Sequence, residues 1–211
     1  MFSNLSFDEL NTLVKNERSL PFEQYFGEMN LPEEDKNERI KIAEELNDKF
    51  LIAMTLLFTM AQFGTVDYEQ IRKSIVKAYT SVLSKYMEVD DYFSTYIESF
   101  AYDAIDSTKR HEGEPYCYSQ DRARFMSENE VNTAINYARF REAEKSGKTI
   151  KEWIAIIDNV TREAHRELNG KRIPIGQAFN VGDSWMLFPK DTSLGASANQ
   201  ICNCRCSIRY Y

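Results

Sequence analysis

A histidine and three cysteines near the C-terminal end are the residues of this chain whose types and spacing best suit chemistry. Cys202, Cys204 and Cys206 alternate with polar residues, and His165 stands earlier in the same part of the chain. This alternation predicts a β-strand that points the three thiols toward one face. Imidazole and thiolate groups are zinc ligands, and a cysteine beside a histidine can also be an activated nucleophile.

A zinc site is the first interpretation. His165, Cys204 and Cys206 would supply three ligands of a tetrahedral ion. The chain has no pair of Cys-x-x-Cys knuckles, so a fourth ligand would have to come from elsewhere. The sequence therefore requires no cofactor, and zinc stays a possibility at these three residues.

A structural role for the cysteines is the second interpretation and the favoured one. Cysteine behaves as a small hydrophobic residue, and three of them followed by Ile208 and Tyr210 form an ordinary core row on a strand. Asp158 and Arg162 have the i, i+4 spacing of a salt bridge on one helix face. Arg205 would face away from the thiols, and we expect it to bind a carboxylate or a main-chain carbonyl.

Catalysis is the third interpretation, through a cysteine–histidine pair or a nuclease that uses His165 with Arg162, Arg166 or Lys171. No second histidine lies near in sequence, and no carboxylate cluster marks a two-metal nuclease. We therefore predict that the protein is not an enzyme. The alternative that stays open is a metal-dependent enzyme or a nucleic-acid-binding effector module built on His165 and the C-terminal cysteines.

The charge is distributed unevenly along the chain. The 211 residues have a net charge of −7, but residues 151–211 carry 8 Lys and Arg against 6 Asp and Glu, which leaves a net charge of −9 for the rest. An acidic surface repels nucleic acid. We expect at most a weak DNA contact, through Lys171, Arg172, Lys190 and Arg209.

The most apolar stretch, residues 50–63, is shorter than the roughly 20 residues that a membrane-spanning helix needs. We predict that it lies in a buried core helix and that the protein does not contact a membrane. The first residues lack the basic and apolar regions of a signal peptide, so we expect reduced thiols in a cytosolic protein.

The periodicity of apolar residues predicts an α+β fold. Residues 1–118 form a mostly helical domain, with a helix capped by Ser6, a long helix over 33–63, and two helices that begin after Asp67 and at Asp90. A polar loop over 109–118 is the expected domain boundary. Residues 119–211 form a small α+β domain with a short antiparallel sheet. Its predicted elements are a helix from 119 to Gly147, a central strand over 149–157, a helix over 159–168 capped by Asp158, strands over 171–175 and 184–188, and a final strand over 202–210.

The order of residues in this second domain resembles that of the phage Mu F-like minor head proteins, also called head morphogenesis proteins. The resemblance starts near Ala123 and runs to the end of the chain. Two features depart from the pattern: Glu128-Asn129-Glu130 stands where the family commonly has Arg-Thr-Glu, and Cys202 is additional. The residues that carry the resemblance, and that we take as a structural signature, are Trp153, Asp158, Arg162, His165, Gly170, Pro189, Asp191, Asn203, Cys204, Arg205 and Cys206.

This resemblance implies a minor structural protein in the head of a tailed phage or prophage-like element. It would act in procapsid assembly at the portal and in DNA packaging or delivery, inside the virion head and earlier in the host cytoplasm. The implied partners are the portal protein and the major capsid or scaffold protein, which the helical part would contact. Some similar proteins carry a toxin domain after the final cysteine, and because only Ser207 to Tyr211 follow here, we expect none.

Overall fold

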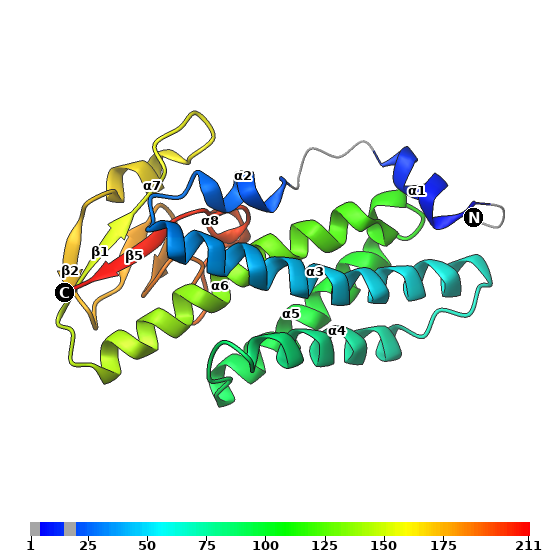
Figure 1. Ribbon diagram of the computed structural model, residues 1–211, viewed down its shortest axis with the longest axis horizontal. Helices are drawn as coiled ribbons and strands as arrows, with labels where there is room; N and C mark the ends of the chain where they lie inside the picture. The colour runs from blue at the N-terminus through cyan, green and yellow to red at the C-terminus, as the bar shows by residue number, and fades with distance from the viewer. Residues whose placement is uncertain (1–4, 15–19) are drawn as a thin grey trace. The chain divides into compact units, whose positions relative to one another are not determined.

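A computed structural model describes residues 5–14 and 20–211 (Figure 1). The chain folds into two compact units. Unit 1 contains the described residues up to Leu20 and Lys41–Glu128, and unit 2 contains Pro21–Ile40 and Asn129–Tyr211. The long helices α3 (Glu33–Gln62) and α6 (Gln120–Lys145) contribute residues to both units.

Unit 1 is helical, as its apolar periodicity predicts. Besides parts of α3 and α6 it contains α1 (Phe7–Leu13), α4 (Tyr68–Leu83), α5 (Asp91–Arg110) and the 3-10 helix η1 (Pro115–Tyr118). Ser6, Asp67 and Asp90 each cap a helix by accepting a main-chain N–H, and Ser6 forms a capping box with Glu9. The predicted caps are therefore confirmed.

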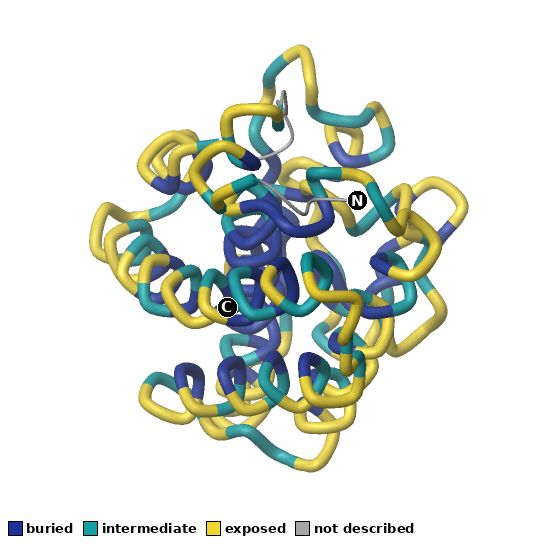
Figure 2. Tube along the Cα trace, turned by 90° about the vertical axis from the view of Figure 1, so that its right-hand side faces the viewer, coloured by how far each residue is buried: buried dark blue, intermediate teal, exposed yellow. Residues whose placement is uncertain are grey.

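The core of unit 1 consists of helix faces rich in aromatic side chains. The ring of Tyr79 packs edge-on against Phe93 and Phe100, with centroids 6.1 and 5.6 Å apart. Buried stretches alternate with exposed ones along the trace in Figure 2, as one-sided packing of helices requires. The second half of α3 is not buried on all sides, although its apolar sequence predicts that it should be. Ile52, for example, is 64% exposed.

No helix in the described ranges combines the length and apolarity needed to cross a bilayer.

Unit 2 is an α+β fold, which confirms the predicted class. A three-stranded antiparallel sheet has the order β2-β1-β5, and β3 and β4 form a separate two-stranded pair. The strands are β1 (Ile150–Ile154), β2 (Arg172–Pro174), β3 (Phe179–Val181), β4 (Ser184–Met186) and β5 (Ser207–Tyr210). The short helices are α2 (Phe22–Gly27), α7 (Glu163–Leu168) and α8 (Ala198–Ile201).

The sheet places β1 at its centre, as predicted, and β2 at an edge. Trp153 of β1 lies opposite Ile208 of β5, and Lys151 lies opposite Ile173 of β2. The edge position of β2 fits its last residue, Pro174, which has no N–H to donate to a further strand.

Several predicted elements of unit 2 are longer than the observed ones. The central strand predicted over 149–157 ends at Ile154, and two further elements begin later than predicted. The last strand begins only at Ser207, because the backbone at Asn203 adopts a left-handed conformation with φ of 54° that breaks an extended segment. The helix predicted over 159–168 begins only at Glu163, so Asp158 caps a turn that precedes it. Val160, which the helix predicted over 159–168 would include, instead lies outside α7 and is 77% exposed.

Candidate metal centre

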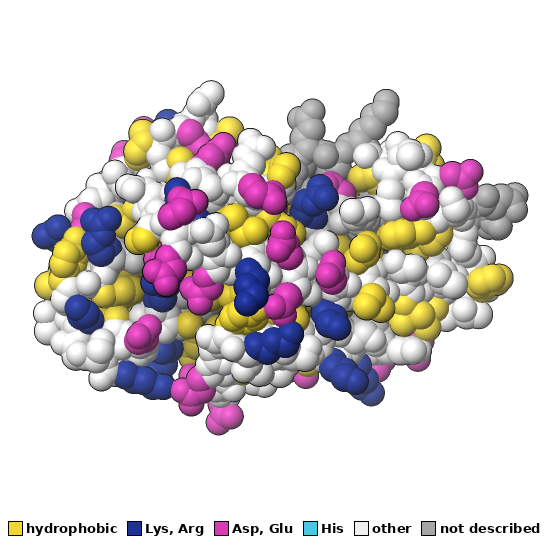
Figure 3. Space-filling view, viewed as in Figure 1, with side chains coloured by type: hydrophobic (Ala, Val, Ile, Leu, Met, Phe, Trp, Pro, Cys, Tyr) yellow, Lys and Arg dark blue, Asp and Glu magenta, His cyan; other side chains and the backbone are white. Residues whose placement is uncertain are grey.

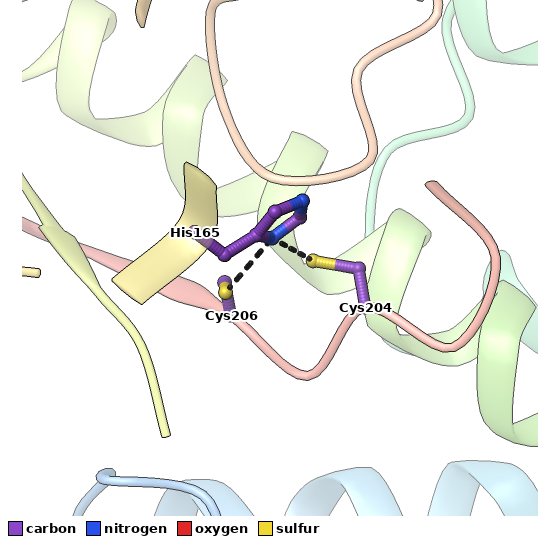
Figure 4. A group of neighbouring side chains, drawn as sticks. All are labelled: His165, Cys204 and Cys206. Atoms are coloured by element: carbon purple, nitrogen blue, oxygen red, sulfur yellow. Dashed lines mark hydrogen bonds between the residues drawn. The ribbon is translucent and has the colours of Figure 1, made fainter. Parts of the chain in front are cut away.

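Three of the residues singled out by the sequence meet in unit 2 (Figure 4). His165 comes from α7, and Cys204 and Cys206 come from the loop that leads into β5. The Nδ1 atom of His165 lies 3.5 Å from the sulfur of Cys204 and 3.4 Å from that of Cys206. The three side chains therefore converge on one point.

This cluster is closed to solvent. His165 is 1% exposed, and Cys204 and Cys206 are each 2% exposed. The indole of Trp153 covers the imidazole edge-on, with ring centroids 5.8 Å apart. Cys202 is exposed at the end of α8. The prediction that it shares a face with the other two cysteines is wrong, because the turn at Asn203 interrupts the alternation.

The second nitrogen of His165 is held by a hydrogen-bonded chain of polar side chains. Its Nε2 atom lies 3.1 Å from Oε1 of Gln200, and the amide nitrogen of Gln200 donates to Asp183 at 3.2 Å. Ser184 and Ser197 also donate to Asp183, and these hydrogen bonds lower the pKa of its carboxyl group. An amide oxygen can only accept, so Nε2 is the donor, and in this tautomer Nδ1 presents its lone pair to the sulfurs.

The two thiols are not equivalent. A hydrogen bond from Cys206, together with the charge of Lys190, holds the pKa of Cys204 well below its usual range despite burial. The adjacent Cys204 and burial raise the pKa of Cys206 well above its usual range.

Two asparagines of α6 fix the backbone of the cysteine loop. The Nδ2 atom of Asn132 donates to the carbonyl oxygen of Cys204 at 2.8 Å, and that of Asn136 donates to Cys206 at 3.1 Å. Arg39 donates in turn to Oδ1 of both asparagines, at 2.8 and 3.4 Å. All three polar side chains are buried, and burial lowers the pKa of Arg39 to about 9. This network sets the positions of the sulfurs before any ligand arrives.

Asn129 holds the left-handed turn that precedes Cys204. Its Oδ1 atom accepts the main-chain N–H of Asn203 and the ammonium group of Lys190, each at 2.8 Å. Lys190 also donates to the carbonyl of Ile201 and is only 4% exposed. Its predicted role in DNA contact is therefore wrong, since the charged group is buried in the protein.

Arg205 links the cysteine loop to two carboxylates, as expected from its alternation with the thiols. It forms ion pairs with Glu28, next to the end of α2, and with Asp158. The predicted pair of Asp158 with Arg162 is wrong, because Arg162 caps α7 and donates to the carbonyl of Cys202 at 2.6 Å. Burial alone would raise the pKa of Asp158, but hydrogen bonds from Thr161 and the charge of Arg205 lower it.

The remaining signature residues shape the backbone around the cluster. Gly170 has φ of 79°, and its N–H donates to the carbonyl of Trp153 at 2.8 Å. The carbonyl of Pro189 accepts from Asn136 at 3.2 Å. Asp191 is buried and accepts main-chain N–H groups of Leu187 and Ser193, which closes a tight turn.

Sequence reasoning missed the polar residues that hold this loop from behind. Asn129, Asn132 and Asn136 recur at i, i+3 and i+7, which is a helical face, among the apolar residues of α6. That spacing was a visible signal of a buried polar row. Arg39 and Lys151 gave no comparable signal, because each stands in a segment with other charged residues and only the tertiary structure buries it.

The comparison with protein families confirms the resemblance found in the sequence. The family described as Phage Mu protein F like protein matches residues 68–209. The NAD(+)–arginine ADP-ribosyltransferase EFV of Enterococcus faecalis is 36% identical over 70 residues, which cover 32% of this chain. The chain spans only 14% of that enzyme's length. No solved structure matches the chain.

Proposed function

The chain belongs to the Phage Mu protein F like family, and from this membership we propose that it is a minor head protein of a tailed phage or prophage-like element. It would act in assembly of the procapsid at the portal and in packaging or delivery of DNA. The match over residues 68–209 is the observation that carries this proposal, because it includes most of unit 1 and nearly all of the described sheet.

The geometry of the signature residues supports a structural role. Asp158 and Arg205, which lie far apart in sequence, form an ion pair, and Asn203 is bound by Asn129 of α6. These residues are used to hold unit 2 together. His165 and the two adjoining cysteines are enclosed, and none of them lines the cavity of about 320 Å³ on the surface of unit 2. A macromolecular substrate could not reach them in this arrangement.

The transferase activity in the name of the Enterococcus faecalis relative is not part of the proposal. Only 14% of that enzyme's length is shared with this chain. The burial of the imidazole and the thiols gives no independent reason for a transferase site.

The proposed partners are proteins, namely the portal and the major capsid or scaffold protein, contacted by the helices of unit 1. A DNA-binding surface has less support. Two of the basic residues predicted to contact DNA, Arg172 and Arg209, lie 3.1 and 4.0 Å from the carboxylate of Glu152, which offsets their charge. Basic and acidic side chains are also interspersed on the face shown in Figure 3. Any contact with DNA would therefore be weak.

Purified particles test the proposal. In a phage or prophage that encodes this chain, mass spectrometry of intact heads should detect it in a few copies per particle. A strain with an amber codon in this gene should form heads that fail to package or deliver DNA, and the unaltered gene supplied in trans should restore infectivity. Cys202→Ser, which alters an exposed residue outside the cluster, should restore it equally well.

One outcome of these experiments would contradict the proposal. The chain could be missing from purified heads, while particles made without it package DNA and infect normally. Such a result would contradict a role in the head.

A further inference from the structure

We propose that His165, Cys204 and Cys206 bind one zinc ion, through Nδ1 and two thiolate sulfurs (Figure 4). The fourth position would be taken by a water molecule, as in other sites where the protein supplies three ligands. Both cysteines would bind as thiolates, and their two negative charges would balance the two positive charges of the ion. This inference concerns unit 2 alone and does not depend on a role in the phage head.

The distances between the ligand atoms match a tetrahedral zinc site. With bonds of about 2.3 Å to sulfur and 2.0–2.1 Å to nitrogen, a tetrahedral angle separates nitrogen from sulfur by about 3.5 Å. The observed distances from Nδ1 of His165 are 3.5 Å to Cys204 and 3.4 Å to Cys206. The potential ligand atoms all lie within 4.8 Å of one another. One ion can therefore contact them together without rearrangement of the backbone.

The hydrogen bonds of His165 favour metal binding over a purely apolar role. Gln200 engages Nε2 at 3.1 Å through its amide oxygen, which leaves the lone pair of Nδ1 directed at the sulfurs. A hydrogen-bonded second nitrogen is the usual support of a metal-binding histidine, because it fixes the tautomer and the ring orientation. Asp183 extends this support by accepting from Gln200.

The chemistry of the ligands selects the kind of metal. Two sulfurs and one imidazole nitrogen suit a thiophilic ion such as zinc, whereas magnesium and calcium prefer oxygen ligands. The loop that carries the sulfurs is fixed by Asn132 and Asn136 through its main-chain carbonyl groups. A bound ion would join α7 to the loop before β5, and would thereby tie together two segments about 40 residues apart.

Metal analysis of the full chain is the direct test. Protein produced with zinc in the medium should contain one zinc per chain by inductively coupled plasma mass spectrometry. Replacement by cobalt(II) should give a thiolate-to-cobalt charge-transfer band in the near ultraviolet. Removal of the ion with a chelator should lower the melting temperature of the unaltered protein, and re-addition of zinc should restore it.

Variants assign the ligands. Cys204→Ser and Cys206→Ser should lose the zinc and the charge-transfer band. Cys202→Ser is the matched control, because it removes an exposed thiol of the same loop and should retain both. Gln200→Leu should keep all three ligands but weaken cobalt affinity by about 10-fold to 100-fold, through loss of the hydrogen bond to His165.

Metal analysis of the unaltered protein tests the zinc proposal even if a cysteine variant does not fold. Absence of stoichiometric zinc together with absence of a cobalt charge-transfer band would overturn the proposal. So would a loss of two hydrogens by mass that shows Cys204 and Cys206 joined as a disulfide in protein purified under reducing conditions. Equal loss of zinc in Cys202→Ser would overturn the assignment of ligands.

Discussion

The side-chain amide of Asn132 in α6 donates a hydrogen bond of 2.8 Å to the carbonyl oxygen of Cys204, 72 residues further along the chain. The same side chain accepts a hydrogen bond from the buried guanidinium group of Arg39. One neutral residue thus connects the cysteine loop to a buried charge. Both tryptophans of the chain, Trp153 and Trp185, belong to unit 2, so tryptophan fluorescence reports on the folding of this unit.

Asn132→Ala should lower the free energy of unfolding of unit 2 by about 2 kcal/mol, because a buried carbonyl and a buried guanidinium group each lose a hydrogen bond of 2.8 Å. Longer contacts remain, from Tyr25 to the carbonyl of Cys204 at 3.3 Å and from Arg39 to Asn136 at 3.4 Å. Urea unfolding followed by tryptophan fluorescence measures the loss. Asn159→Ala, at an exposed position, is the matched control and should change stability by less than about 0.5 kcal/mol. Equal effects of the two substitutions would show that the network contributes nothing specific.

Arg205→Ala should destabilise unit 2 by about 2 kcal/mol, because Arg205 is nearly buried and pairs with both Glu28 and Asp158. Arg205→Lys should recover only part of this loss, since one ammonium group does not reproduce the two separate contacts of a guanidinium group. The comparison is with Arg209→Ala, whose side chain is 55% exposed. If urea unfolding gave the same small change for both alanine variants, the ion pairs would be of no consequence.

Lys151 should make the stability of unit 2 increase with pH. Burial lowers the pKa of Lys151 from 10.5 to about 8, with Asp191 and Glu144 opposing the shift. Between these two values the unfolded chain binds more protons than the folded chain, so stability rises with pH across this window and the gain is absent below it. The size of the shift corresponds to about 3 kcal/mol.

Urea unfolding at about pH 7 and about pH 10 tests this dependence. Relative to Lys151→Met, the unaltered protein should become more stable by about 2–3 kcal/mol between the two conditions. Lys148→Met, at an exposed position just before β1, provides the control and should leave the pH dependence unchanged. If the difference in unfolding free energy between the unaltered protein and Lys151→Met were the same at both pH values, the lowered pKa of Lys151 would be contradicted.

Gly170→Ala should cost about 1 kcal/mol, because a side chain is strained at a φ of 79°. Crowding contributes little, as an added Cβ atom would meet its nearest neighbour, Glu152, only at 3.9 Å. Gly176→Ala is the matched control, since its φ lies outside the left-handed region and its surroundings are open. A stabilising effect at Gly170 would contradict the role of this turn.

Much of the fold could be predicted because it depends on local patterns. The spacing of apolar residues marks the long helix that ends at Gln62, and the caps Asp67 and Asp90 mark where α4 and α5 begin. The β-branched and aromatic run around Trp153 marks the central strand. The short pair of β3 with β4 was only half predicted, because strands of three residues are too short to show a period.

The sequence by itself determined which residues matter in unit 2. The order of Trp153, His165 and the Asn203–Cys206 segment was sufficient to place the chain in its family. It could not determine their contacts. A left-handed residue at Asn203 turns Cys202 out to solvent and brings Cys204 and Cys206 to His165. That backbone conformation depends on a hydrogen bond that the main-chain N–H of Asn203 donates to Asn129, far away in sequence, and only the tertiary structure brings such partners together.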